Sequence, residues 1–115
     1  LMMDCRKKML EALNECGEAA LFYSGMNILE VNEHFAEMFE KTVAECEGMP
    51  ILSICHNEST EKIRDFIHRR KTGDPNVPIH YQAKFVTPSD PEVTLSLTVI
   101  KLRDVKKAVL VIVRK

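Results

Sequence analysis

Apolar residues near the start of the chain recur at steps of three and four, which predicts an amphipathic helix over residues 1–16. The apolar positions that share one face of this helix are Met2, Cys5, Met9, Ala12, Leu13 and Cys16. Gly17 is suited to follow the helix, since glycine readily adopts the left-handed conformation found there. A stripe this narrow can pack on a sheet or pair with a copy of itself. Met2, Cys5, Met9 and Leu13 are therefore candidate dimer contacts.

The next segment alternates between short strands and short helices. Strands are expected over 19–23 and 28–31, and the four residues between them, Ser24–Asn27, predict a hairpin turn. Asn32 stands where a helix N-cap belongs, and Phe35, Met38 and Phe39 follow at helical spacing, so a helix is expected over 32–41. Two further helical turns are expected near 43–47 and 51–55.

A longer helix is predicted after residue 58. Its apolar side consists of Ile63, Phe66 and Ile67, with Ser59 or Thr60 as the N-cap and Gly73 after its end. The period then changes from helical to alternating, which predicts two half-buried strands. Their inward positions are Val77, Ile79, Tyr81, Ala83 and Phe85, followed by Val93, Leu95, Leu97 and Val99.

Residues 108–113 are apolar throughout and form the last predicted strand. Antiparallel strands usually have one solvated face, so a strand that is apolar on both faces needs a cover. The cover is expected to be the N-terminal helix or a second subunit. The order of helix, two strands, several short helices and three longer strands predicts an α+β fold.

Composition narrows the class of protein. A chain of 115 residues, 45% of them apolar, suits one domain with one core. The 16 basic and 17 acidic residues are spread along the chain and leave a net charge of −1, which argues against nucleic-acid binding or contact with an acidic membrane. No apolar run approaches the roughly 20 residues of a membrane span. We expect a cytoplasmic domain whose four cysteines are free thiols.

Residues 28–48 resemble the PAS (sensory box) domain family. Ile28-Leu29-Glu30-Val31-Asn32-Glu33-His34-Phe35 is similar to the family's apolar strand ending in Val-Asn, with Phe three residues later. Further similarities are Met38-Phe39, Glu45, Gly48, the helix end Arg69–Gly73 and the last strand Val111–Arg114. The loop Pro88–Pro91 departs from the family, where many members have Asp-Gly. The resemblance covers roughly residues 17–115, which divides the chain into a capping or dimerisation helix (1–16) and a PAS-like domain (17–115).

The resemblance implies a five-stranded antiparallel sheet with short helices across one face. It also implies a sensor that passes a ligand- or partner-dependent conformational signal to a covalently attached effector. Such effectors are histidine kinases of two-component systems, cyclic-dinucleotide enzymes or transcription regulators. A homodimer is expected. The alternative is a homodimerisation or protein-interaction module with a filled core and no ligand.

A small-molecule ligand of such a domain would bind between the helices and the sheet. The candidate lining residues are Asn32, Phe35, Met38, Phe39, Ile51, Leu52, Ile63, Phe66, Ile67, Phe85 and Leu97. Asn32 has a structural interpretation as well, because an asparagine at a strand-to-helix junction can cap the helix and bond a neighbouring loop.

A third hypothesis is a haem- or flavin-based redox sensor. In the resemblance, the cysteine position of flavin-binding members falls on Ile51, and Cys55 comes four residues too late. The axial histidine position of haem-binding members falls near Lys62 or Ile63, five residues before His68, which is expected to face solvent. No cofactor is therefore predicted. The histidines have no metal-ligand spacing, and without a phosphate loop or a zinc-protease motif the chain is not expected to be an enzyme.

Overall fold

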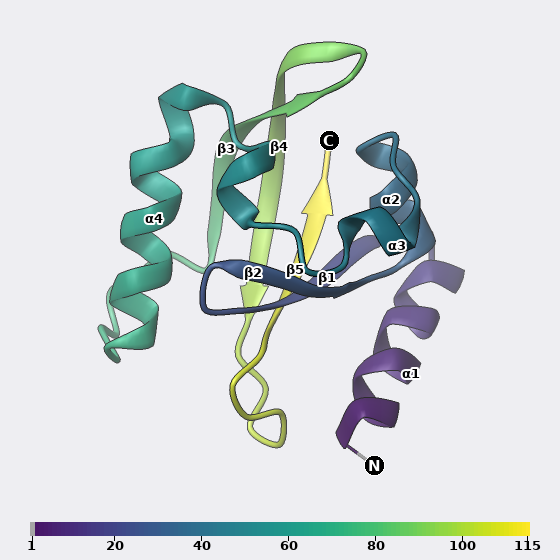
Figure 1. Ribbon diagram of the computed structural model, residues 1–115. Coiled ribbons are helices and arrows are strands. Elements are labelled where there is room, and N and C mark those ends of the chain that lie inside the picture. Colours follow the sequence, from purple (N-terminus) through teal and green to yellow (C-terminus); the bar gives the residue numbers. More distant parts are fainter. Residues whose placement is uncertain (1) are drawn as a thin grey trace.

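The computed structural model of this chain describes residues 2–115, with side chains from residue 5 on. Its elements are, in order, α1 (Met2–Glu15), β1 (Ala19–Ser24), β2 (Asn27–Val31), α2 (Glu33–Met38), α3 (Val43–Cys46), the 3-10 turn η1 (Ile51–Ile54), α4 (Asn57–Lys71), β3 (His80–Thr87), β4 (Asp90–Ile100) and β5 (Val109–Arg114) (Figure 1). This order confirms the predicted α+β class.

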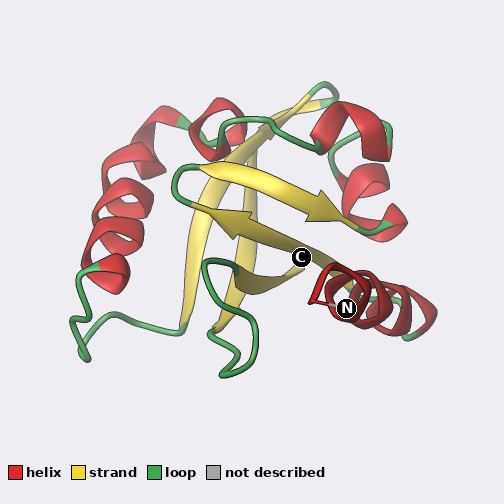
Figure 2. Ribbon diagram, turned by 60° about the horizontal axis from the view of Figure 1, so that its bottom comes forward, coloured by secondary structure: helices red, strands yellow, loops and turns green. Residues whose placement is uncertain are grey.

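The five strands form one antiparallel sheet in the order β2-β1-β5-β4-β3. The last strand therefore lies in the middle, between β1 and β4. Figure 2 shows α2, α3, η1 and α4 above one face of the sheet, and α1 apart from them on the opposite side. Alternation along β1 explains this arrangement, because Leu21 and Tyr23 enter the main core whereas Ala20 and Phe22 face α1.

The outer face of the sheet carries a second, smaller group of buried residues, which we call the outer cluster. It consists of Leu10, Ala20, Phe22, Val105, Ala108 and Leu110, with Met9 and Leu13 partly buried beside them. Along β5, Val111 and Val113 point into the main core, while Leu110 points into the outer cluster. The predicted cover over this strand is thus supplied by α1 and by the β4–β5 loop of the same chain.

The buried face of α1 differs from the prediction by about one residue. Leu10, which the predicted stripe omitted, is only 4% exposed, whereas Cys5 and Cys16 are exposed. Met9 and Leu13 do pack on the sheet. The side chain of Met2 lies outside the described residues. Cysteine is only weakly apolar and occurs on both buried and exposed faces of helices. Because the predicted stripe included two cysteines, it defined the buried face of α1 poorly.

The start of α4 also corrects the prediction. The N-cap is His56, whose Nδ1 accepts a hydrogen bond from the Glu58 N–H (3.1 Å), and the helix begins at Asn57. Ser59 is instead buried inside the first turn, where its Oγ accepts a hydrogen bond from the Lys84 N–H (2.8 Å). Thr60 donates its hydroxyl hydrogen to the His56 carbonyl and caps nothing.

Three other boundaries differ. The hairpin turn is shorter than expected, because Ser24 pairs with Asn27 and only Gly25 and Met26 lie between them. Helix α2 ends at Met38 rather than residue 41. Strand β3 begins at His80, so Ile79 precedes it and is 56% exposed, although the alternation had placed this side chain inside.

Candidate functional site

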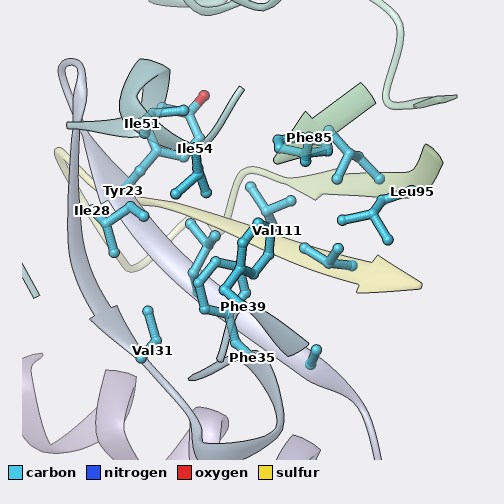
Figure 3. Packing of buried hydrophobic residues seen from close by; sticks show 14 of the residues in the cluster. Tyr23, Ile28, Val31, Phe35, Phe39, Ile51, Ile54, Phe85, Leu95 and Val111 are labelled. Carbon is cyan, nitrogen blue, oxygen red and sulfur yellow. The ribbon is translucent and has the colours of Figure 1, made fainter. Parts of the chain in front are cut away.

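The main core contains an apolar cavity of about 50 Å³ between the inner face of the sheet and the helices. The residues that line it come from all parts of the chain: Leu21, Tyr23, Ile28, Phe35, Phe39, Ile51, Ile54, Ile63, Ile67, Arg70, Tyr81, Phe85, Leu97, Val99, Val111 and Val113. In Figure 3, Ile51 and Ile54 reach from η1 toward the strands, and Phe39 lies below Val111. The volume is that of a few heavy atoms, so most of the core is filled.

Aromatic packing closes one side of the cavity. The rings of Phe35 and Phe39 are stacked with centroids 4.7 Å apart, as the i, i+4 spacing allows. The ring of Phe85 meets Phe39 edge-on at 5.9 Å. Such contacts hold three large side chains in fixed orientations, which makes this wall rigid.

Three residues that line the cavity carry polar groups. Arg70, in the last turn of α4, donates from Nη1 to the Tyr23 hydroxyl oxygen (3.4 Å) and from Nη2 to the Pro78 carbonyl (2.8 Å). The half-buried Tyr81 lies on the same wall, and burial raises the pKa of its phenol to about 12, so the group stays neutral and can donate a hydrogen bond at ordinary pH. These three side chains, which we call the polar end, are convergent polar groups of the kind that orient a ligand in an apolar pocket.

The sequence-based candidates divide into two sets. Seven of them line the cavity: Phe35, Phe39, Ile51, Ile63, Ile67, Phe85 and Leu97. Met38 and Leu52 are partly buried against the main core but do not line the cavity, and Phe66 packs edge-on against the Tyr81 ring at 4.8 Å. A ligand-binding role for any of these residues stays a prediction.

The polar end was missed by the sequence reasoning. Tyr23 follows Leu21 by two positions on an inward-facing strand, and Arg70 follows Ile67 by three positions on a helix. Both spacings placed these residues on buried faces, and this was the signal that could have found them.

Asn32 lies at a junction rather than in the cavity wall. Its Oδ1 accepts hydrogen bonds from the Phe35 N–H (3.0 Å) and the Ala20 N–H (3.1 Å). Its Nδ2 donates to the Glu18 carbonyl (2.8 Å) and the Leu10 carbonyl (3.3 Å). The predicted double role is therefore confirmed, whereas the placement of Asn32 in the pocket was wrong. One side chain, 6% exposed, connects α1, β1 and α2.

A buried ion pair stands beside this junction. The Arg6 side chain of α1 donates to the Glu30 carboxylate of β2, and both side chains are largely buried. Asn32 and this pair together fasten α1 to the edge of the sheet. We call them the α1 latch.

A haem or a flavin does not fit this core. Pockets for drug-sized ligands enclose roughly 300–1,000 Å³, against about 50 Å³ here. His68 is exposed on α4, and His56 is engaged as a helix cap. Burial raises the pKa of the Cys55 thiol to about 12, so it is protonated and a poor nucleophile.

Within the described part of the chain, no group of three or more His, Cys, Asp or Glu residues is placed to hold a metal ion. None of its helices is both long and apolar enough to cross a membrane.

Comparisons of sequence found nothing: neither a protein-family model nor a curated protein matches the chain. Comparison of structure found many matches. A domain of a sensory box sensor histidine kinase/response regulator from Geobacter sulfurreducens superposes with a TM-score of 0.72 at 16% identity, covering 96% of this chain and 94% of that one. A PAS domain from a two-component sensor histidine kinase gives 0.65 at 18% identity, covering 99% and 98%.

The third match is to a quorum-sensing receptor PAS domain from Cronobacter turicensis in complex with C12:0. It gives a TM-score of 0.70 at 9% identity, over 86% of this chain and 93% of that one. At such identities the agreement concerns the path of the backbone, and it covers nearly the whole length of each partner.

Proposed function

This chain has the PAS fold, and from that premise we propose that it is a signal-sensing regulatory domain. The domain passes a ligand- or partner-dependent conformational signal to an effector attached to it in the full-length protein. Solved structures of the same fold come from sensor histidine kinases and a quorum-sensing receptor, which supports an effector of the signalling class. The proposal includes a cytoplasmic location and no catalytic step in this domain.

The proposal rests on the cavity with its polar end, because the strand β1 lines this cavity on one face of the sheet and supports α1 on the other face. Strand β1 lines the cavity through Leu21 and Tyr23 and contacts the outer cluster through Ala20 and Phe22. A ligand that displaces this strand therefore changes the packing of α1 on the other face. A conformational signal needs only such a difference in contacts between two states.

The second candidate function is a ligand-free dimerisation module. The small size of the cavity favours it, because a core with only about 50 Å³ of space is close to full. In this case α1 would pair with a copy of itself through its exposed side, which carries Cys5.

A cavity-filling variant of the full-length protein separates the two functions. Val99→Ile with Val113→Ile adds one methyl group at each of two buried cavity positions. For a sensor, we expect a small molecule to be recovered by mass spectrometry from the denatured wild-type protein but not from the variant, and the effector output to stop responding to its signal.

The matched control is Val93→Ile, a half-buried position on the same strand as Val99 that does not line the cavity. A ligand-free module predicts that no small molecule is recovered and that the filled variant keeps wild-type output. That pair of results would refute the sensing function.

A further inference from the structure

A groove of about 850 Å³ lies between the end of α4, the β1–β2 turn and the β4–β5 loop. In Figure 1 this loop projects at the same end of the molecule as the last turn of α4. Six of the residues that line the groove are cationic: Arg70, Lys71, Lys101, Arg103, Lys106 and Lys107. Among the residues whose side chains the structure describes, no carboxylate lines it. The basic residues of two segments that are distant in sequence, 70–71 and 101–107, therefore gather in space, and we call this feature the basic groove.

The charges of the basic groove lack local neutralisation. Among the described residues, none of the six cations forms an ion pair with a carboxylate. Asp104 is the one acidic residue within 101–108, and it does not line the groove. Since the chain as a whole has a net charge of −1, the rest of the chain is strongly acidic on balance. A concave surface of one sign in a protein of the other sign concentrates anions locally.

The basic groove and the core cavity share a wall. Tyr23, Ile67 and Arg70 line both. An arginine guanidinium has five N–H donors, and Arg70 directs its Nη1 and Nη2 groups to Tyr23 and Pro78. Arg70 therefore stands between the apolar cavity and the basic groove, with N–H donors left for a further acceptor. The planar guanidinium is the side chain best matched to a carboxylate or phosphate.

We propose that the ligand of this domain is a small amphipathic anion. Its carboxylate or phosphate head binds Arg70 in the basic groove, and its short apolar tail enters the core cavity. The lysines of the β4–β5 loop attract the anion without contacting it individually. This inference rests on the proposed sensing function and specifies the chemistry of the ligand.

Binding of matched six-carbon compounds tests the proposal. Hexanoate, hexyl phosphate and the neutral 1-hexanol are titrated into the ¹⁵N-labelled protein, with acetate and inorganic phosphate as heads without a long tail. We expect at least one of the two hexyl anions to bind about tenfold or more tightly than hexanol, since a charge-assisted hydrogen bond is lost with the alcohol. The preferred anion identifies the head group.

We expect chemical-shift changes at both the basic groove and the core cavity, namely at residues 67–71, at residues 101–108 and in the strands that line the cavity. Affinity should fall as NaCl is raised, because the loop charges are exposed. Equal affinity for hexanol and the anions would overturn the proposal, as would the absence of binding by either anion.

Charge variants locate the head group. Arg70→Gln should weaken binding of the preferred anion about tenfold or more. Arg64→Gln is the matched control, since Arg64 lies on the same helix but does not line the basic groove. The double variant Lys106→Gln, Lys107→Gln changes two exposed loop residues without touching the core, and it should lower affinity a few-fold and flatten the salt dependence.

The double variant keeps the test decisive if Arg70→Gln unfolds. Wild-type affinity and salt dependence in every folded groove variant would refute the proposed site. Recovery of a neutral apolar molecule from the native protein would refute the anion while leaving the sensing function intact. Absence of any ligand, with unchanged output from the filled-cavity variant, would refute the sensing function itself.

Discussion

The two faces of the sheet are stabilised in different ways. Among the side chains that the structure describes, the main core on the inner face has 20 buried apolar residues, whereas the outer cluster has six. The inner face is packed by side chains from α2, α3, η1 and α4. The outer face relies on Leu10 and a few neighbours, together with the polar α1 latch. A region with few buried contacts opens locally at lower free energy than the core. The comparison therefore identifies α1 as the element that moves most readily.

The largest effect is expected from the main core. Phe39→Ala removes a ring that is 1% exposed and contacts both Phe35 and Phe85, so the free energy of unfolding should fall by about 3–5 kcal/mol. Urea unfolding followed by circular dichroism measures it. Hydrogen exchange should accelerate in all five strands. A loss below about 1 kcal/mol would show that this wall is not tightly packed.

The second largest loss of stability is expected at the α1 latch. Asn32→Ala leaves two buried N–H groups and two carbonyls without their partner, so we expect a loss of about 3 kcal/mol in the free energy of unfolding. Asn32→Asp is the informative control, because it keeps the acceptor for Phe35 and Ala20 but loses both donations. If the aspartate variant matched the wild type, the bonds to the Leu10 and Glu18 carbonyls would contribute nothing.

A smaller and local effect is expected from the outer cluster. Leu10→Ala should cost about 2 kcal/mol, because Leu10 lies at the margin of the sheet where neighbours can partly close the space. Hydrogen exchange followed by mass spectrometry should show faster exchange in residues 5–15 and little change in β4 and β5. Uniform acceleration across the sheet would contradict the division into two regions.

The native cysteine thiols can probe the two regions without any mutation, and the modification itself perturbs the protein least. Cys5 and Cys16 are exposed on and after α1, while Cys46 is buried and Cys55 half-buried in the main core. Burial raises the pKa of Cys46, and that of Cys55 to about 12. At pH 8, maleimide should therefore modify the first pair at least about tenfold faster than the second. Mass spectrometry of peptides after timed quenching measures the rates.

The pH dependence of stability follows from the same pKa shifts. The Cys55 thiol and the Tyr81 phenol have raised pKa values of about 12, against 9.0 and 10.0 for the unperturbed groups. As the pH rises, the unfolded chain loses these protons before the folded chain does. The contribution of the two groups to the free energy of unfolding is therefore complete below pH 9 and is lost as the pH rises toward 12. Tyr81→Phe should flatten the upper part of this decline.

The element order could be predicted from the sequence because period-two and period-3.6 patterns depend only on neighbouring residues. Val93 to Val99 and Ile63 to Ile67 are clear examples. The wall formed by Phe35, Phe39 and Phe85 followed from those patterns together with the family resemblance.

Local patterns could place Tyr23 and Arg70 on buried faces, but they could not predict the contact between them or the basic groove. Arg70 meets Tyr23 across 47 residues of sequence, and the cations of 101–107 join it only because the β4–β5 loop and the end of α4 lie at the same end of the fold. The error in the buried face of α1 had a similar origin, because Leu10 packs against Ala20, Phe22 and Leu110 of the sheet and the pattern along the helix does not contain these partners.

The central position of β5 has a consequence for synthesis of the chain on the ribosome. The hairpins β1–β2 and β3–β4 are both synthesised before β5, the first long before it and the second just before it. Each has an unpaired edge until β5 emerges and joins them. Arg114 at the end of that strand then pairs with Glu18 before β1, so the last step of assembly joins segments 96 residues apart. Folding of this domain is thus delayed until its C-terminal strand has left the exit tunnel.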